Sequence, residues 1–323
     1  MRYIAKNTAV PNYLLRASAF GGAGVHVFIL CSGFGLFLSY KKRALTYFGF
    51  LKRRFGKVYF SYITVVLLTF VWISLTEKRL PWYQLASHVF LFKMFSPSLD
   101  ESMGVQMWFI STIIQFYLVF YLLCQIKAIA HQSLRSSDTV LLIACFCCSM
   151  LWLAVVYLTG HNGDRNWSSF FITYLWEFYL GMYIAQYYYD HGRLPLIEVS
   201  YIKLLSCFLI FFAIYIVLST SGSIIRVFND PFSLGAYLSL ALLVYRSPLG
   251  LINHFIKRVS KYSYELYLLH ILIFSICFYY LSEINLTLSV VVSLAVAFTA
   301  SYLYYRITSR ISLPLIGKTA HLQ

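Results

Sequence analysis

Residues 21–43, GGAGVHVFILCSGFGLFLSYKKR, form one apolar run that is long enough to cross a lipid bilayer as a helix. Glycines and His26 lie near its start, and three cations close it, Lys41, Lys42 and Arg43. The whole 323-residue chain has this character, since 60% of its residues are hydrophobic, 19% are aromatic and only 11% are charged. A water-soluble domain of this size could not keep so much apolar surface away from water, so the composition places the chain in a membrane.

Nine stretches of the sequence are apolar over the roughly 20 residues that a membrane-spanning helix needs. They lie at about 22–40, 57–76, 107–126, 139–159, 168–188, 201–220, 232–246, 263–282 and 286–306. Lipid cannot satisfy open backbone groups, and these stretches are too long for the strands of a membrane barrel. The sequence therefore predicts an all-α polytopic membrane protein with about nine transmembrane helices.

The distribution of Lys and Arg predicts the orientation, because these residues are retained in cytoplasmic loops. The loop after the first stretch carries seven of them, and if this loop is cytoplasmic, alternation leaves most of the 26 Lys and Arg residues inside. We expect a polar N-terminal tail at 1–20, a single membrane domain at 21–310 and a cytoplasmic C-terminal tail at 311–323. The net charge of +15 then reflects topology and anionic lipid, and it does not indicate nucleic-acid binding.

The seven cysteines all lie within the predicted spans. Cys145, Cys147 and Cys148 form a cluster, but their spacing splays the side chains around a helix, and no histidine or acid accompanies them on that span. Buried free cysteines usually pack as small apolar residues. We therefore expect no metal site.

Ionisable residues inside a bilayer usually face a cavity or a partner, and His26 and Glu177 are the first candidates for function. His26 shares a helical face with Gly22 and Gly33, which is typical either of a packing seam or of a polar cavity where His26 accepts a proton. Glu177, in WEFYLGMYIAQ (176–186), lies roughly ten residues into a predicted span. Its carboxylate either bridges helices or serves a reaction.

A cationic group lies at the cytoplasmic end of the second span, in FLKRRFGKVYFSY (50–62). Arg53, Arg54 and Lys57 are spaced so that they fall on one side of a helix. These residues either only set the orientation of the protein in the membrane or form a clamp for an anionic ligand that carries phosphates.

A polar stripe enters the membrane from the inside in SKYSYELYLLH (260–270), where Ser263, Tyr267 and His270 share one helical face. The tyrosines suit interfacial anchoring, whereas His270 is favoured as a functional residue.

Five stretches, taken in order, resemble the landmarks of the membrane acyltransferase-3 family over nearly the whole chain. They are GVHVFILCSGFGLFL, FLKRRFGKVYFSY, MWFISTIIQFYLVFYLL, WEFYLGMYIA and YSYELYLLH. The resemblance implies a ten-span protein that takes an acyl group, commonly acetyl, from cytoplasmic acyl-coenzyme A. The acceptor that it implies is an extracytoplasmic carbohydrate hydroxyl, on a lipid-linked or a surface polysaccharide. The location that it implies is the bacterial inner membrane.

This resemblance assigns roles to the polar residues above. A neutral histidine would accept the proton of the acceptor hydroxyl, and the expected catalytic residues are His26, Glu177 and His270. The phosphates of acyl-coenzyme A, with acetyl-coenzyme A the commonest donor, would lie against the cationic group of Arg53, Arg54 and Lys57.

Aromatic side chains suit the sugar rings of such an acceptor, and the predicted outer loop 77–106 and the start of the next span carry several. The expected substrate-binding residues are Trp82, Tyr83, His88 and Trp108. The alternative is an interfacial belt or a re-entrant helix.

Two features depart from the family pattern. Relatives carry an Arg-rich pattern that ends in proline where this chain has Phe60, and the family's first span, with an Arg and a catalytic His about ten residues later, has no counterpart in residues 1–20. We expect in-frame DNA upstream of Met1 to encode that span, in which case His26 assists the upstream histidine near the outer face. If Met1 is the true start, His26 becomes the leading base, or the chain is an inactive truncated acyltransferase.

The alternative function is non-enzymatic, either a polysaccharide exporter or an accessory membrane subunit. An exporter should have spans that are broken by Gly or Pro near the middle of the membrane. The seven prolines lie near span ends or in loops, which favours the acyltransferase.

Overall fold

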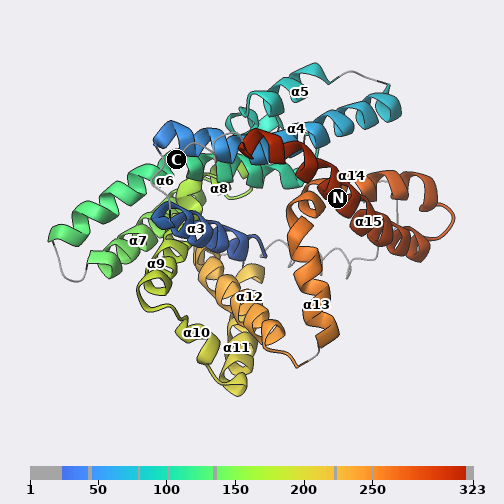
Figure 1. Cartoon of the computed structure of the whole chain (residues 1–323). Helices are drawn as coiled ribbons and strands as arrows, with labels where there is room; N and C mark the ends of the chain where they lie inside the picture. Colours follow the sequence, from blue (N-terminus) through green and yellow to red (C-terminus); the bar gives the residue numbers. More distant parts are fainter. Residues whose placement is uncertain are drawn as a thin grey trace. The chain divides into compact units, whose positions relative to one another are not determined.

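The computed structural model describes residues 24–42, 46–78, 81–99, 102–133, 137–221, 224–248 and 250–317, and all regular structure in them is helical (Figure 1). The α-helices are α3 (Gly24–Lys42), α4 (Tyr47–Glu77), α5 (Trp82–Val89), α6 (Trp108–Ser133), α7 (Ser137–Leu158), α8 (Arg165–Ser168), α9 (Leu175–His191), α10 (Pro195–Glu198), α11 (Tyr201–Thr220), α12 (Asn229–Tyr245), α13 (Gly250–Val259), α14 (Ser263–Leu281) and α15 (Leu286–Gly317). Short 3₁₀ turns join them at η1 (Lys93–Phe95), η2 (Pro97–Leu99), η3 (Val105–Met107), η4 (Phe171–Tyr174), η5 (Ile224–Phe228) and η6 (Ser260–Tyr262).

Among the described residues, 7 helical stretches are long and apolar enough to cross a membrane. They are Gly24–Lys42, Tyr47–Glu77, Trp108–Ala130, Asp138–Leu158, Tyr201–Thr220, Gly250–Leu281 and Leu286–Arg310. Large apolar side chains such as Leu151, Ile202 and Val217 are exposed, as expected for groups that face lipid. The chain is therefore an all-helical, polytopic membrane protein, as predicted.

The two remaining predicted spans also hold helices, α9 and α12, of 17 residues each. That is fewer than the roughly 20 residues of a perpendicular crossing, so the total of nine crossings stays a prediction. The proposed N-terminal tail at 1–20 lies outside the described residues. At the other end, α15 continues to Gly317, past residue 311 where we expected the C-terminal tail to begin.

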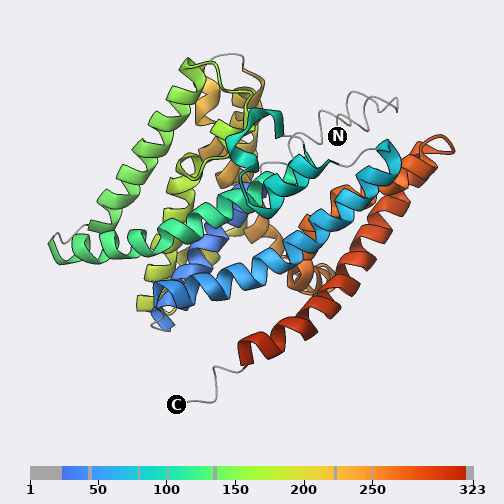
Figure 2. The same cartoon turned by 90° about the horizontal axis from the view of Figure 1, so that it is seen from above.

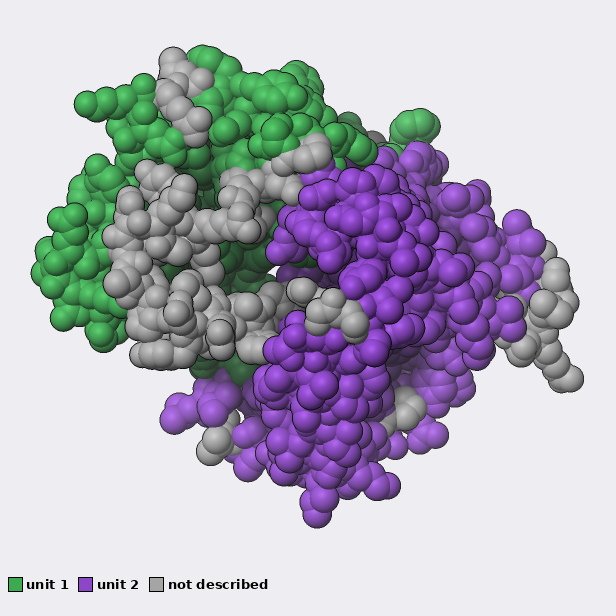
Figure 3. All heavy atoms as spheres, turned by 180° about the vertical axis from the view of Figure 1, so that it is seen from behind, with its two compact units in different colours: residues 1–12, 48–111, 254–323 green, residues 13–47, 112–253 purple. Residues whose placement is uncertain are grey.

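The chain forms two compact units (Figure 3). Unit 1 comprises residues 1–12, 48–111 and 254–323, and unit 2 comprises residues 13–47 and 112–253. In unit 1, α14 and α15 pack as an antiparallel helical hairpin (Figure 2). In unit 2, α9 packs against both α3 and α7, and α12 packs against both α3 and α11.

In unit 2, α3 and α9 approach each other at two glycines. A Cβ atom on Gly33 would lie 2.1 Å from the backbone oxygen of Phe178, and one on Gly181 would lie 2.1 Å from the backbone oxygen of Leu30. No side chain fits at either position, so the two helices pack with their backbones in contact. This crossing holds the start of α3 beside the start of α9.

The segment before α9 differs from the prediction. We expected one span over 168–188, with Glu177 deep inside it, but α9 begins only at Leu175. Glu177 therefore lies in the first turn of the helix and not about ten residues into one.

Polar side chains from α6 and α7 explain this irregular backbone. Thr112 donates to the backbone oxygen of Ser169 at 2.6 Å, and the side-chain oxygen of Gln115 accepts from the backbone N–H of Phe171 at 3.1 Å. The hydroxyl of Ser149 donates to the backbone oxygen of Ile172 at 2.7 Å. Non-helical backbone is stable within a membrane protein where such partners replace water. Hydropathy alone cannot reveal these partners, which come from other spans.

Candidate active site

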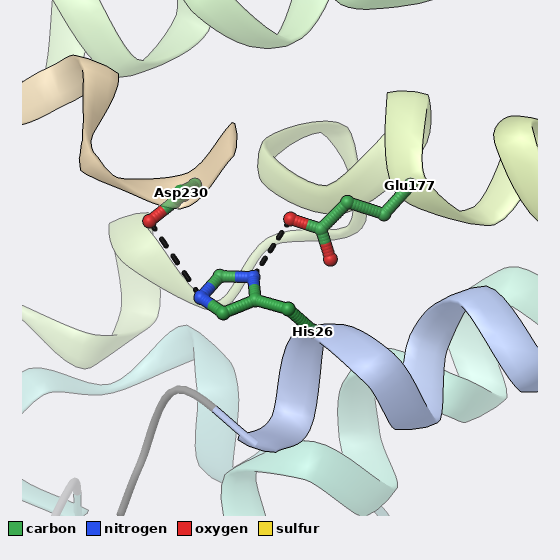
Figure 4. Close-up of side chains that lie close together, drawn as sticks. All are labelled: His26, Glu177 and Asp230. Atoms are coloured by element: carbon green, nitrogen blue, oxygen red, sulfur yellow. Dashed lines mark hydrogen bonds and ion pairs between the residues drawn. The ribbon is translucent and has the colours of Figure 1, made fainter. Parts of the chain in front are cut away.

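His26, Glu177 and Asp230 meet within unit 2 (Figure 4). The imidazole Nδ1 of His26 lies 2.7 Å from Oε1 of Glu177, and its Nε2 lies 3.6 Å from Oδ1 of Asp230. Glu177 is fully buried and His26 is 9% exposed. One imidazole ring is thus flanked by two carboxylates in a largely buried position.

Each of these residues lies in the first turn of its helix. His26 is the third residue of α3, Glu177 is the third residue of α9 and Asp230 is the second residue of α12. The first turn of a helix has backbone N–H groups without intrahelical partners, and the helix dipole makes this end positive. The starts of α9 and α12 therefore favour the negative charge of the two carboxylates that face His26.

The hydrogen bond to Glu177 defines what the ring can do. An ionised carboxylate only accepts hydrogen bonds, so Nδ1 of His26 is the donor, and in the neutral ring Nε2 carries the lone pair. The 3.6 Å separation from Asp230 is longer than a hydrogen bond. A hydroxyl oxygen that binds beside both groups can lie within hydrogen-bond distance of Nε2 of His26 and of the Asp230 carboxylate. This arrangement can take a proton from such a hydroxyl and stabilise the resulting imidazolium.

The same three side chains are also a candidate cation site, since their ligand atoms all lie within 4.8 Å of one another. However, the two ring nitrogens of His26 face different carboxylates, Nδ1 facing Glu177 and Nε2 facing Asp230 (Figure 4). The geometry therefore favours a hydrogen-bonded cluster over a metal centre, and the expected absence of a metal stays a prediction.

His270, the third residue expected in catalysis, belongs to unit 1. Its Nδ1 lies 2.8 Å from the backbone oxygen of Tyr267 and 3.1 Å from that of Leu266, so it donates to its own helix, α14. None of the described residues hydrogen-bonds its Nε2, which is therefore the proton-accepting nitrogen of the neutral ring.

The expected donor clamp lies in α4, which begins well before the predicted second span. Arg53 is exposed there, and the guanidinium of Arg54 lies over the ring of Phe50, 5.9 Å from its centroid. The side chain of Lys57 lies outside the described residues. The helix therefore includes all three cationic positions, and their contact with acyl-coenzyme A stays a prediction.

The aromatic residues expected to bind the acceptor differ in accessibility. Trp82 and Tyr83 are exposed, and their rings contact Phe70 and Phe92 at centroid distances of 5.0 and 5.8 Å. Trp108 is buried. Of these three residues, only Trp82 and Tyr83 are exposed, and the role of all of them in binding stays a prediction.

His88 is fully buried in a hydrogen-bond network of unit 1. Its Nε2 lies 3.1 Å from the backbone oxygen of Ser102 and therefore donates, whereas Nδ1 accepts from the hydroxyl of Tyr62 at 2.7 Å. The ammonium of Lys93 donates to the same oxygen of Ser102 at 2.9 Å. Burial, together with the nearby Lys93 charge, lowers the pKa of His88 to about 3, so the ring is neutral. The hydrogen bonds of His88 stabilise the segment that contains Ser102, and a contact between His88 and the acceptor stays a prediction.

Sequence reasoning missed Asp230 as a member of the cluster. Asp230 precedes Pro231 and an apolar run, a pattern that is typical of a helix start and could have placed an acid in the first turn of α12. Nothing in the local sequence, however, indicates that this turn faces His26.

Comparison with known proteins gives the family context. The sequence model of a protein family described as an acyltransferase domain matches residues 3–306, which includes every site residue named above. No curated protein and no solved structure matched the chain.

Proposed function

Because this chain belongs to the acyltransferase-3 family, we propose that it carries an acyl group from cytoplasmic acyl-coenzyme A to a carbohydrate hydroxyl outside the membrane. Membership of this family makes the chain an acyltransferase, and its apolar helices embed it in a membrane. Acetyl as the acyl group, a surface polysaccharide as the acceptor and the bacterial inner membrane as the location are parts of the proposal.

The observation that carries this proposal is the imidazole of His26 between the carboxylates of Glu177 and Asp230. Nε2 of His26 accepts the proton of the acceptor hydroxyl while the hydroxyl oxygen attacks the thioester carbonyl carbon. The carbon–sulfur bond then breaks, and Nε2 returns the proton to the coenzyme A thiolate. The products are an ester and free coenzyme A, and the two carboxylates stabilise the imidazolium between these steps.

The predicted orientation supports an acceptor on the outer side. Alternation of the nine predicted spans puts the starts of α3, α9 and α12 at the same, extracytoplasmic, face. The cluster lies at these three starts, whereas Lys41 and Lys42 lie at the opposite end of α3. The positive-inside rule places such cations in the cytoplasm.

The proposal also assigns roles to the other predicted site residues. Arg53, Arg54 and Lys57 bind the phosphates of the donor from the cytoplasm. In unit 1, His270 is a second candidate for proton transfer because of its proton-accepting Nε2, and Trp82 and Tyr83 are candidates for stacking on sugar rings.

The test is the ester content of the surface glycans of the host, with the gene deleted and then restored. Restoring the wild-type chain should restore the esters, whereas His26→Asn should not, at equal protein levels. Asparagine keeps an N–H donor near the position of Nδ1 and removes the proton-accepting Nε2. His254→Gln, at an exposed histidine of α13, is the matched control and should behave as the wild type. Esters that are unchanged by the deletion would contradict the proposal and favour an exporter or an accessory subunit.

A further inference from the structure

A cavity of about 490 Å³ adjoins the cluster of His26, Glu177 and Asp230 within unit 2. Its wall is formed by the end of α7, the loop and short helix α8 that follow, η4, η5 and the start of α12. The volume lies in the range of roughly 300–1,000 Å³ that is typical of small-molecule sites. This cavity therefore has the size of a substrate pocket.

Two residues belong to both the cavity wall and the cluster. Asp230 lines the cavity and faces Nε2 of His26 at 3.6 Å. Tyr174 also lines it, and its ring centroid lies 5.7 Å from that of His26. A hydroxyl group on a molecule in this cavity is therefore close to the nitrogen that accepts the proton.

Residues with hydrogen-bonding side chains line the cavity beside the cluster. Asn162 and Arg165 are both exposed and offer donors along its wall. Leu153, Val156 and Val227 form an apolar part of the same wall. This mixed lining suits a small polar molecule that also has an apolar face.

Stacked rings hold the loop that carries Asn162 and Arg165. The ring of Trp167 stacks on His161 at a centroid distance of 4.5 Å and on Trp152 at 5.6 Å. The indole N–H of Trp152 also donates to the backbone oxygen of Trp167 at 3.2 Å. Ring stacking and this hydrogen bond therefore stabilise the conformation of this wall, as a preformed site requires.

We propose that this cavity is the acceptor site and binds one pyranose residue, an inference that rests on the proposed function. A pyranose has an apolar face of C–H groups, which suits the rings of Tyr157 and Tyr174, and an edge of hydroxyls, which suits Asn162 and Arg165. The hydroxyl that receives the acyl group lies between Asp230 and Nε2 of His26.

Kinetics in proteoliposomes test this assignment, with acetyl-coenzyme A as the donor and a panel of methyl hexopyranosides as the acceptor probes. Asn162→Leu keeps the approximate size of the side chain and removes its hydrogen-bonding amide from the cavity wall. The KM for the glycoside should rise roughly tenfold, the loss expected for one hydrogen bond, with the KM for acetyl-coenzyme A and the melting temperature unchanged. Thr159→Val is the control, because this exposed hydroxyl bonds its own helix at the backbone oxygen of Val155, 2.7 Å away.

A second variant does not depend on which glycoside is used. Gly163 lines the cavity, and a Cβ atom there meets no atom within 4 Å, so Gly163→Trp should fold and fill the space. It should abolish ester formation on host glycans while acetyl-coenzyme A binding, measured by calorimetry, is retained.

The outcomes separate the two proposals. A wild-type chain that acetylates neither the glycosides nor the host glycans would overturn the proposed function and this inference with it. Transfer by the wild type, with unchanged glycoside kinetics in Asn162→Leu and unchanged host esters in Gly163→Trp, would overturn the cavity assignment alone.

Discussion

Nδ1 of His26 and Oε1 of Glu177 lie 2.7 Å apart, although 151 positions separate the two residues in the sequence. The contact depends on the backbone approach of α3 and α9 at Gly33 and Gly181. A histidine and a carboxylate that are buried together in this way stabilise each other's charged forms. The pair is therefore both a link between two helices and the part of the cluster that orients the imidazole.

Removing the charge of Glu177 should separate its role in linking two helices from its role in orienting the imidazole. Glu177→Gln keeps the size of the side chain, but a neutral amide neither selects the Nδ1–H form of His26 nor stabilises the imidazolium. Ester transfer per molecule should fall on the order of 100-fold, measured with radiolabelled acetyl-coenzyme A in membranes at matched protein levels. Glu198→Gln, at an exposed position in α10, should have no effect. Full activity in Glu177→Gln would show that the pair is only structural.

The glycine crossing should be intolerant of a single methyl group. Gly33→Ala or Gly181→Ala would bring Cβ to 2.1 Å from a backbone oxygen of the partner helix, so the helices must move apart. We expect a loss of about 1–3 kcal/mol in the free energy of unfolding, together with a loss of transfer. Thermal unfolding in detergent measures the first effect.

Gly35→Ala provides the matched control for this crossing. It lies on the same helix, and a Cβ atom there meets no atom within 4 Å. This variant should be as stable as the wild type or slightly more stable, since alanine favours helices. Equal stability of Gly33→Ala, Gly181→Ala and Gly35→Ala would show that the close approach of α3 and α9 is not required.

A mostly buried ion pair between Lys127 of α6 and Asp138 of α7 should stabilise unit 2. The ammonium of Lys127 also lies over the rings of Phe37 and Tyr179, at 5.5 and 5.8 Å from their centroids. Lys127→Met leaves Asp138 without its partner and should cost about 3 kcal/mol of unfolding free energy. The double variant Lys127→Met/Asp138→Leu should recover most of this loss.

Unfolding in detergent by a denaturant titration would measure these differences. Lys203→Met, at an exposed lysine of α11, should change the unfolding free energy little. A double variant that is no more stable than Lys127→Met would contradict this account of the pair.

The neutral ring of His88 should make the stability of the protein depend on pH. Unfolded histidine binds a proton below about pH 6.5, whereas folded His88 does so only near its lowered pKa of about 3. Protons therefore favour the unfolded state between these values, and the stability contributed by neutral His88 is lost as the pH falls through this window.

At pH 5 the loss should be about 2 kcal/mol relative to pH 7. His88→Gln, which cannot take up a proton, should show a smaller loss over the same range, measured as melting temperature against pH. His254→Gln should keep the slope of the wild type. Identical slopes in the wild type and His88→Gln would show that His88 does not cause the effect.

The cationic positions on α4 should bind the donor. Arg53→Ala/Arg54→Ala should weaken acetyl-coenzyme A binding roughly 10- to 100-fold in calorimetry, because charge-assisted hydrogen bonds to phosphate are lost. Lys52→Ala, at an exposed neighbour on the same helix, is the control for a general loss of positive charge. Equal affinity of the wild type and the double variant, with membrane insertion intact, would leave the two arginines with a role in topology alone.

The class of the protein and several candidates for its site can be recognised in the amino-acid sequence alone. Apolar stretches of about 20 residues can be recognised locally, because a helix in lipid must satisfy its own backbone and bury no charge without a partner. For the same reason His26 and Glu177 stand out, since each interrupts an apolar stretch.

The way in which these residues combine depends on the packing of the helices. The start of α9 at Leu175 depends on Thr112, Gln115 and Ser149, which bond its preceding backbone from other helices. Asp230 joined the cluster because α12 packs against α3, and nothing in its local sequence indicates that contact. Hydropathy and helical period are properties of neighbouring residues, whereas the partners of a buried polar group are chosen by the packing of helices far apart in the chain.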